Sequence, residues 1–460
     1  MLRLAGSWHE QDNRLRIEIL KRVKDDEEKM QKQIAKIILM CFLFACLSSK
    51  ISAQPANTWY VDDLGDGKPG SGSKEDPFRD LQKAIDHAGN GDIIRILPGI
   101  YAAKPLPYPE DLCGNCLEHR TPVSATRGFL IQGKGLHIIG SGTDQTTLIT
   151  HAGYGVLFDH SRGSVITVVR ITGGKRDPDG NATDAAVVAK FSTVQVIGVE
   201  ILDNTHQVEG VVVGIGGVFG RENSELLIQG NKIQNNGWDG VALYRGANAT
   251  IEDNTISKGR GAGIGITWDA VAVVYRNEIS EYWKGIGTFG NSFAVVRNNA
   301  VYDNLGWGII ATGEATMEVS NNVIFHNGNC GFAAWEETVR GELTNNIIVK
   351  NGWRKEWVCP QVGIWMNADP KKNFPVTYNN VWGNPPYSPF NKGGKGDYRG
   401  MKRPQKKLGN FSVDPLFQGE KDFHFSPQSP LIDAGDPALT DPNGSRSDLG
   451  IYGGPSARIE

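Results

Sequence analysis

The sequence predicts a right-handed parallel β-helix, because two columns of residues repeat together at nearly constant spacing. One column is asparagine followed two positions later by an apolar residue, and the other is glycine followed directly by an apolar residue. Between them, short runs alternate apolar and polar side chains, as β-strands do, and no helical stripe is present. Such a repeat is typical of a coil of short strands with right-handed crossovers. We expect roughly ten turns between Ile93 and Trp382.

The asparagine column predicts a ladder of amides inside the coil. Its steps are 22 to 24 residues, except for a last step of 34. An amide both donates and accepts, so each can bond to its copy in the next turn. The two columns consist of Asn231, Asn254, Asn277, Asn299, Asn322, Asn346 and Asn380, and of Gly240, Gly263, Gly285, Gly308, Gly331 and Gly363.

The beginning of the chain resembles an export signal. Lys32 and Lys36 precede an apolar run over 37–47, which is followed by a small-residue cleavage site near Ala53. The run is too short to span a membrane as a helix. Because Met30 opens the signal, we interpret residues 1–29 as an upstream extension from a misplaced start codon. A genuine cytosolic extension is the alternative for these residues. For the signal itself, the alternative is a lipoprotein signal that ends at Cys46. We expect a secreted, periplasmic or cell-surface protein.

The remaining chain divides by its patterns into four parts. We expect an N-terminal cap over 54–101, coils over 102–383, a basic Pro/Gly-rich loop over 384–410 and an irregular closing segment over 411–460. A net charge of -3 argues against nucleic acid as a partner. No transmembrane segment is expected, and we expect a monomer.

Export would place the cysteines in an oxidising compartment, where disulfides form. Cys330 directly precedes a ring glycine, and Cys359 lies three residues before the corresponding position of the next turn, which predicts a bridge between adjacent turns. Cys113 and Cys116 are predicted to staple a loop. A zinc site there is the alternative, with His119 nearby and no local fourth ligand.

Two terminal segments resemble those of secreted bacterial proteins of the pectate-lyase-like right-handed β-helix superfamily. The first runs from Thr-Trp-Tyr-Val-Asp-Asp at Thr58 to Pro-Gly-Ile-Tyr at Tyr101, and the second from Asp-Pro-Leu-Phe at Asp414 to Gly453. The resemblance implies the fold over nearly all of 55–455. It does not imply one activity, because such coils host lyases, epimerases, hydrolases and adhesins. The motifs of polygalacturonases, mannuronan epimerases and classical pectate lyases are absent, which argues against those subfamilies.

Aligned on the ring glycines, one outward position is mostly acidic. Carboxylates in register on successive strands would lie about 4.8 Å apart and would repel one another unless a cation intervened. Hard oxygen ligands at this spacing suit Ca²⁺. The alternative is a solvated edge of the turns. The candidate metal ligands are Asp269, Glu314, Glu337 and Asp369.

Aromatic residues occupy outward positions on the same strands. Exposed aromatic faces in a row can stack on sugar rings, so we predict a carbohydrate-binding surface. The alternative is that the loops over 103–128 and 173–185 fold across these side chains and bury them. The candidate substrate-binding residues are Tyr244, Trp268, Phe289, Trp307, Trp335 and Trp365.

Charged residues near the ring glycines are candidates for catalysis. Elimination from a uronic acid needs a cation on the substrate carboxylate and a base for the α-proton. Lys284 and Arg245 are candidates for the base or the carboxylate clamp, with Asp239 and Asp269 as metal or acid partners. Surface ion pairs are the alternative for each. We therefore expect a calcium-dependent lyase or C5-epimerase that acts on an acidic, uronate-containing glycan. The alternative is a non-catalytic carbohydrate-binding solenoid.

Overall fold

The computed structural model describes residues 56–63, 69–113, 121–205, 214–355, 360–384, 396–404 and 406–458. All described elements belong to one compact unit that begins at Asn57. The expected extension over 1–29 and the expected signal over 30–53 lie outside these residues. No helix within the described part of the chain is long and apolar enough to cross a membrane.

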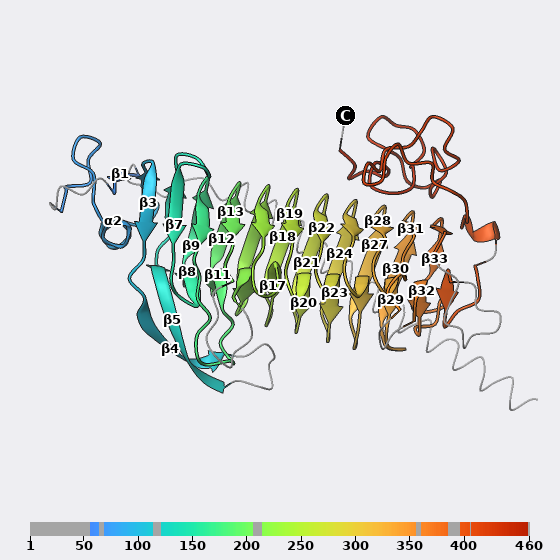
Figure 1. The fold of residues 1–460 in the computed structure, drawn as a ribbon, viewed down its shortest axis with the longest axis horizontal. Helices are drawn as coiled ribbons and strands as arrows, with labels where there is room; N and C mark the ends of the chain where they lie inside the picture. The colour runs from blue at the N-terminus through green and yellow to red at the C-terminus, as the bar shows by residue number, and fades with distance from the viewer. Residues whose placement is uncertain are drawn as a thin grey trace, which may run out of the picture. The chain divides into compact units, whose positions relative to one another are not determined.

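Three sheets of strands stacked in sequence order make up the coil (Figure 1). The pairing is parallel throughout, apart from one antiparallel hairpin, and equivalent strands of successive turns pair side by side. The predicted parallel β-helix is therefore confirmed. The eleven strands of the second sheet are close to the ten turns expected.

Sheet A contains twelve strands whose inward side chains belong to the main core. They are β1 Thr58–Val61, β2 Ile93–Ile96, β6 His137–Ile139, β9 Arg162–Thr167, β12 Thr193–Ile197, β15 Glu225–Gln229, β18 Asn248–Glu252, β21 Val271–Tyr275, β24 Phe293–Arg297, β27 Thr316–Ser320, β30 Arg340–Thr344 and β33 Val376–Thr377.

Sheet B contains eleven shorter strands that follow those of sheet A across a tight turn. They are β3 Gly99–Ala102, β7 Thr146–Ile149, β10 Arg170–Thr172, β13 Glu200–Leu202, β16 Lys232–Gln234, β19 Thr255–Ser257, β22 Glu278–Ser280, β25 Ala300–Tyr302, β28 Val323–Phe325, β31 Ile347–Val349 and β34 Asn380–Trp382.

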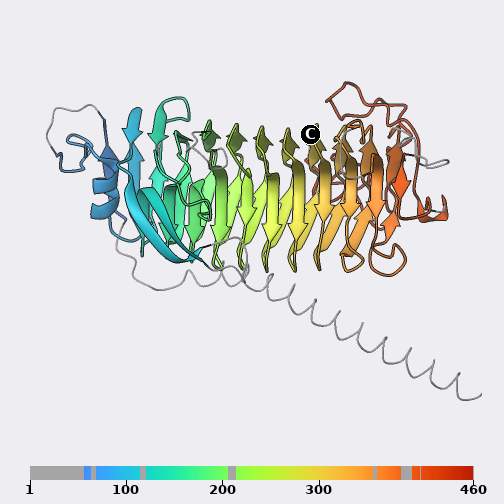
Figure 2. The ribbon, with the colours of Figure 1, turned by 60° about the horizontal axis from the view of Figure 1, so that its bottom comes forward.

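Sheet C contains twelve strands and includes the antiparallel hairpin of β4 and β5 at one edge (Figure 2). They are β4 Leu106–Cys113, β5 Thr121–Gln132, β8 Tyr154–Asp159, β11 Ala185–Lys190, β14 Gly216–Arg221, β17 Val241–Leu243, β20 Ala262–Thr267, β23 Lys284–Phe289, β26 Trp307–Ala311, β29 Cys330–Ala334, β32 Val362–Met366 and β35 Tyr398–Arg399.

A buried ladder of amides links the turns between sheets A and B, as the asparagine column predicts. Asn277, for example, donates from Nδ2 to Asn299 Oδ1 at 3.0 Å, and Asn299 repeats the contact with Asn322 at 3.0 Å. The prediction was wrong for the last member. Asn379 accepts from Asn346 at 2.9 Å and continues the ladder, whereas Asn380 lies in β34 and exchanges hydrogen bonds with Val413.

The glycine column permits close contact between turns inside sheet C. A Cβ on Gly285 would lie 2.5 Å from the carbonyl oxygen of Gly308 and 2.4 Å from Val301 Cγ1. A side chain at this position would therefore displace the next turn.

Short segments complete both ends of the coil. Helix α2, Leu81–His87, is capped by Asp80 and buries Leu81, Ala84 and Ile85 against the first strands. At the other end, a 3₁₀ turn η1, Lys406–Leu408, follows β35. The coil extends past the expected boundary at 383, because β35 pairs with β32 and Asn410 accepts from the backbone of Asn379 at 3.0 Å.

The segment after residue 411 is irregular, as expected, and covers the outer face of sheet B (Figure 1). Its Phe423, Leu431 and Leu449 pack against residues of β25, β28 and β31. Asn298 also donates to the carbonyl oxygen of Gly453 at 2.7 Å. The segment thus lies along the coil and leaves the outer face of sheet C uncovered by its contacts.

Candidate functional site

The outer face of sheet C carries a row of five different side chains on successive turns. Strand pairing aligns Ala262 with Lys284, Lys284 with Trp307, and Trp307 with Cys330. Asp239 belongs to the preceding turn, where its side chain accepts a hydrogen bond from the backbone of Ala262. The register of the turns therefore brings Asp239 and Lys284 into one row on sheet C.

The carboxyl group of Asp239 is held in a poorly hydrated position. Its Oδ1 accepts from the Ala262 N–H at 2.6 Å. Gly261 allows this contact, because a Cβ there would lie 1.8 Å from the same oxygen. Burial raises the pKa of Asp239 to about 6, against the opposing effects of the Ala262 hydrogen bond and Lys284. The group can therefore carry a proton near neutral pH.

Lys284 lies two turns further along the same face. Burial lowers the pKa of its amine, and the charge of Asp239 raises it in part. The Nζ atom lies 5.6 Å from the centre of the Phe289 ring and 6.0 Å from that of Trp307. An amine with a lowered pKa is a better general base at neutral pH than an ordinary lysine.

A small side chain separates these two groups, because Ala262 occupies the position in register between them. Gly265 lies three residues further along the same strand, and Asp239 Oδ2 lies 3.6 Å from the place of its absent Cβ. Two strand spacings amount to about 10 Å between the backbones of the two turns. The acid and the amine can therefore contact opposite sides of one sugar residue.

The predicted aromatic surface divides into two parts. In the downstream part, Trp307 is buried and packs with Trp283, Trp335, Trp365 and Phe289, which remain partly exposed. The ring centres of neighbouring tryptophans are 4.3 to 5.9 Å apart. These rings form a continuous aromatic cluster beside Lys284.

The upstream part follows the alternative expectation, in which loops cover the aromatics. Tyr244 is only 7% exposed and packs edge-on against Phe219 at 5.7 Å. Val123 of the β4–β5 hairpin and Ala182 of the loop before β11 belong to the same cluster, and Trp268 packs against it. The prediction of Tyr244 as an exposed stacking residue is therefore not supported.

Arg245 is not brought to Asp239 and Lys284. It follows the end of β17, whereas Asp239 precedes the beginning of that strand. Its guanidinium group is buried and forms an ion pair with Glu222. A role as the clamp on a substrate carboxylate does not fit this position, because Glu222 already satisfies the charge.

The predicted calcium ligands lie along one edge without converging. Asp269, Glu314 and Glu337 are exposed, one in each of three turns. Asp269 and Asn291 bond to each other, and Asp369 accepts from the backbone of Lys371 at 2.9 Å. Within the described ranges, no group of three or more His, Cys, Asp or Glu could hold a metal ion. These residues therefore do not fit a calcium site.

The predicted disulfides stay predictions. Cys330 is buried at the beginning of β29. Cys359 and Cys116 lie outside the described residues, as does the side chain of Cys113.

Sequence reasoning missed a buried ion cluster under the hairpin. Glu110 accepts from Lys190 at 2.7 Å, from Arg221 at 2.6 Å and from the Tyr154 hydroxyl at 2.6 Å. Despite burial, the two cations and the hydrogen bonds lower the pKa of Glu110 to about 2. Lys190 and Arg221 occupy the same register position on adjacent strands, so the sequence could have shown that these two cations lie side by side. Glu110 could not be placed beside them, because it belongs to a hairpin that has no repeat. This cluster stabilises the hairpin over sheet C.

A second ladder of asparagines, between sheets B and C, was also missed. Asn304, Asn327 and Asn351 bond in sequence at 2.9 Å. Two adjacent turns depart from it, with Gly259 and Tyr282 at the equivalent positions. Tyr282 is fully buried, and its ring fills the space beside Gly259, where a Cβ would lie 2.1 Å from it. The departure falls in the turns that carry Gly261 and Lys284.

Three parallel sheets wound into one coil define this chain as a parallel β-helix protein. The family model described as "Right handed beta helix region" matches residues 127–279 and 216–381, which together exceed half of the chain. The chain belongs to this family.

Solved structures of the same architecture are distant in sequence. Pectate lyase Pel9A is 15% identical, with a TM-score of 0.46 over 87% of this chain and 97% of its own. The A-module of the Azotobacter vinelandii mannuronan C-5 epimerase AlgE4 is 16% identical, with a TM-score of 0.36 over 71% of this chain and 87% of its own. The Dettilon tailspike protein is 16% identical, with a TM-score of 0.41 over 71% of this chain and 69% of its own. Similarity at this level carries no argument about activity.

Proposed function

We propose that this chain is an exported polysaccharide-active protein, and that the outer face of its sheet C acts as a lyase or C5-epimerase on a uronate-containing glycan. The observation that carries the proposal is the pair formed by Asp239 and Lys284. Burial raises the pKa of the first and lowers that of the second, and the small residues Ala262 and Gly265 lie on the intervening strand β20. Titratable groups perturbed in opposite directions are typical of acid–base sites.

The two groups have complementary roles in this proposal. The Lys284 amine takes the proton from C5 of the uronate. In elimination, the electron pair of the broken C5–H bond forms the C4–C5 double bond, and the C4–O bond breaks. Protonated Asp239 then gives its proton to the leaving oxygen. In epimerisation, Asp239 would return a proton to C5 from the opposite side.

A cation beside the substrate carboxylate would make the C5 proton more acidic. Arg245 is engaged with Glu222, so we assign this role to Arg260, which is exposed in the turn directly before Gly261. Replacing Arg260 by alanine should raise KM for a charged substrate more than it lowers kcat. We assign calcium no site, because the four predicted ligands do not converge, and a chelator tests whether the activity depends on it.

Ultraviolet absorbance tests the lyase form of the proposal, because elimination creates an unsaturated uronate. The protein is incubated with polygalacturonate, alginate and heparan-type substrates, with and without chelator. The proposal predicts rising absorbance on one of them, lost in Lys284→Ala. Rising absorbance that persists unchanged in Lys284→Ala would remove this lysine from the mechanism.

Non-catalytic carbohydrate binding is the second candidate function, and the tryptophan cluster favours it. Trp283, Trp307, Trp335 and Trp365 form a contiguous, partly exposed aromatic surface that needs no base to stack on sugars. Affinity electrophoresis in gels containing acidic polysaccharide separates the two functions. Retardation lost in Trp335→Ala, with no chemical change in any substrate, would favour the binder.

A further inference from the structure

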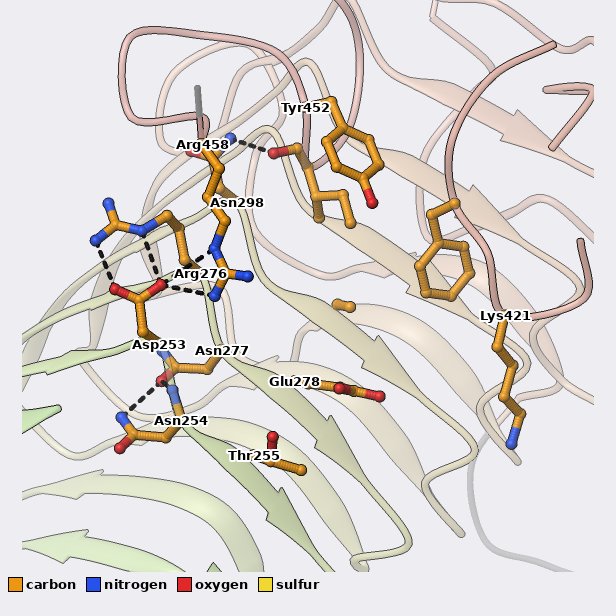
Figure 3. Close-up of a pocket in the computed structure, with 13 residues that line it drawn as sticks. Asp253, Asn254, Thr255, Arg276, Asn277, Glu278, Asn298, Lys421, Tyr452 and Arg458 are labelled. Carbon is orange, nitrogen blue, oxygen red and sulfur yellow. Dashed lines mark hydrogen bonds and ion pairs between the residues drawn. The ribbon is translucent and has the colours of Figure 1, made fainter. Parts of the chain in front are cut away.

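Two neighbouring cavities are lined by the C-terminal segment, away from the sheet C surface, and the first of them also by the outer face of sheet B. The first has a volume of 270 Å³ and lies against β19 and β22 (Figure 3). The second has a volume of 430 Å³ and lies within the C-terminal segment. Tyr452 and Arg458 line both, so the two cavities are neighbours at these residues. The second volume is within the range of about 300–1,000 Å³ that ligand sites occupy, and the first is slightly below it.

Ion pairs hold one wall of the first cavity in place. Asp253 accepts from Arg276 at 2.8 Å and from Arg458 at 2.7 Å, and Figure 3 shows the two guanidinium groups converging on this carboxylate. Arg276 belongs to the coil and Arg458 to the C-terminal segment. The shared carboxylate therefore ties the two walls together.

The charges of the lining argue against an anionic ligand. Arg276 and Arg458 both pair with Asp253, and Arg276 also pairs with Glu252 at 2.9 Å. Lys421 pairs with Asp303 at 2.6 Å. The cations that line these cavities are thus already neutralised. Glu278, Asp441 and Asp448 add carboxyl groups to the lining. A uronate would meet net negative charge here.

The remaining polar groups suit hydroxyl groups. Thr255 and Glu278 are exposed on the outer face of sheet B, where Glu278 accepts from the Tyr302 hydroxyl with one of its two oxygens. Gln418, Asn443, Asp441 and Asp448 line the second cavity. Carboxylate oxygens accept from sugar hydroxyls, and amides both accept and donate.

Aromatic rings provide the apolar surface. Tyr452, at the junction, stacks on His424 with ring centres 4.1 Å apart. Phe423 lines the first cavity and Phe425 the second. Few fixed polar groups together with aromatic faces are the usual composition of a sugar site.

We propose that this pair of cavities binds a neutral oligosaccharide, with one sugar residue stacked on the face of Tyr452 opposite His424. The proposal is independent of the catalytic function assigned to sheet C, because none of its residues lies on that sheet. It makes the chain a protein with two glycan sites of opposite preference, one for uronates on sheet C and one for uncharged sugars beside sheet B. The protein could then remain attached to a neutral glycan while it contacts an acidic one.

Calorimetric titration of the full chain tests the proposal with defined trisaccharides. Cellotriose, xylotriose and mannotriose are the neutral probes, and trigalacturonate is the charged one. We expect one neutral trisaccharide to bind with an affinity that does not change with salt, since no ion pair forms. Tyr452→Ala should weaken the affinity for this trisaccharide about tenfold through loss of stacking. Thr255→Val, which keeps the shape of the side chain, should weaken it roughly fivefold through loss of one hydrogen bond.

Trp335→Ala on sheet C is the matched control. It should leave the affinity for the neutral trisaccharide unchanged and weaken the binding of trigalacturonate to sheet C. The proposal is overturned if no neutral trisaccharide binds, if both Tyr452→Ala and Thr255→Val bind it as the parent does, or if trigalacturonate displaces it. Each of these results is distinct from a failure of catalysis on sheet C.

Discussion

Replacing Asp239 by asparagine should make the protein more stable at neutral pH. Burial raises the pKa of this carboxyl group from 3.8 to about 6, so the folded state holds its proton more tightly than the unfolded state does. This difference in pKa lowers the free energy of unfolding at neutral pH by about 3 kcal/mol, a value that partial exposure of the side chain reduces to about 1–3 kcal/mol. Asparagine keeps the acceptor for the Ala262 N–H and removes the charge.

The sign of the pH dependence follows from proton binding. Between pH 3.8 and about 6 the folded state binds more protons at Asp239 than the unfolded state, so the stability of the parent falls as pH rises through this window. The advantage of Asp239→Asn should therefore be near zero below pH 3.8 and reach its full size above pH 6.

Urea unfolding monitored by tryptophan fluorescence at several pH values measures this difference, provided the slope of the transition is unchanged. Asp269→Asn, at an exposed turn of the same face, is the control and should change stability by no more than about 0.5 kcal/mol. If Asp239→Asn has the stability of the parent, or less, at neutral pH, then burial does not perturb this group and the reasoning fails.

Three further substitutions test how the fold holds the site. Asn299→Ala removes one amide of the ladder and leaves buried partners unpaired, so urea unfolding should show a loss of about 3 kcal/mol. Gly285→Ala should lower Tm strongly because its Cβ would overlap the next turn, whereas Gly180→Ala, which has open space around it, should not. Glu110→Gln leaves the buried Arg221 without its carboxylate and should cost about 3–5 kcal/mol; because the pKa of Glu110 is lowered from 4.5 to about 2, its contribution in the parent is present above pH 4.5 and lost toward pH 2.

The sequence predicts the coil well because its ladders are local repeats. Each amide bonds to its copy in the next turn, so identity and spacing carry the information. The error at Asn380 arose where the spacing lengthened after Asn346 and two asparagines stood together. Only the pairing of β31 with β34 distinguishes Asn379, in the ladder, from Asn380.

The surroundings of the site were less predictable because they depend on segments without a repeat. The row containing Asp239 and Lys284 follows from the register of the turns. Burial of Tyr244 depends on a hairpin more than a hundred residues upstream, and the cover over sheet B depends on an irregular segment. Neither segment has a period that could align it with the coil.

Proton NMR of uronate oligosaccharides incubated with the protein in D₂O tests the central claim most directly, because both a lyase and an epimerase must remove the C5 proton. The account predicts either a new olefinic signal or the loss of the C5 proton signal by exchange, with both effects absent in Lys284→Ala. If every uronate tested keeps its C5 proton and gains no olefinic signal, the outer face of sheet C is not a catalytic site of this kind.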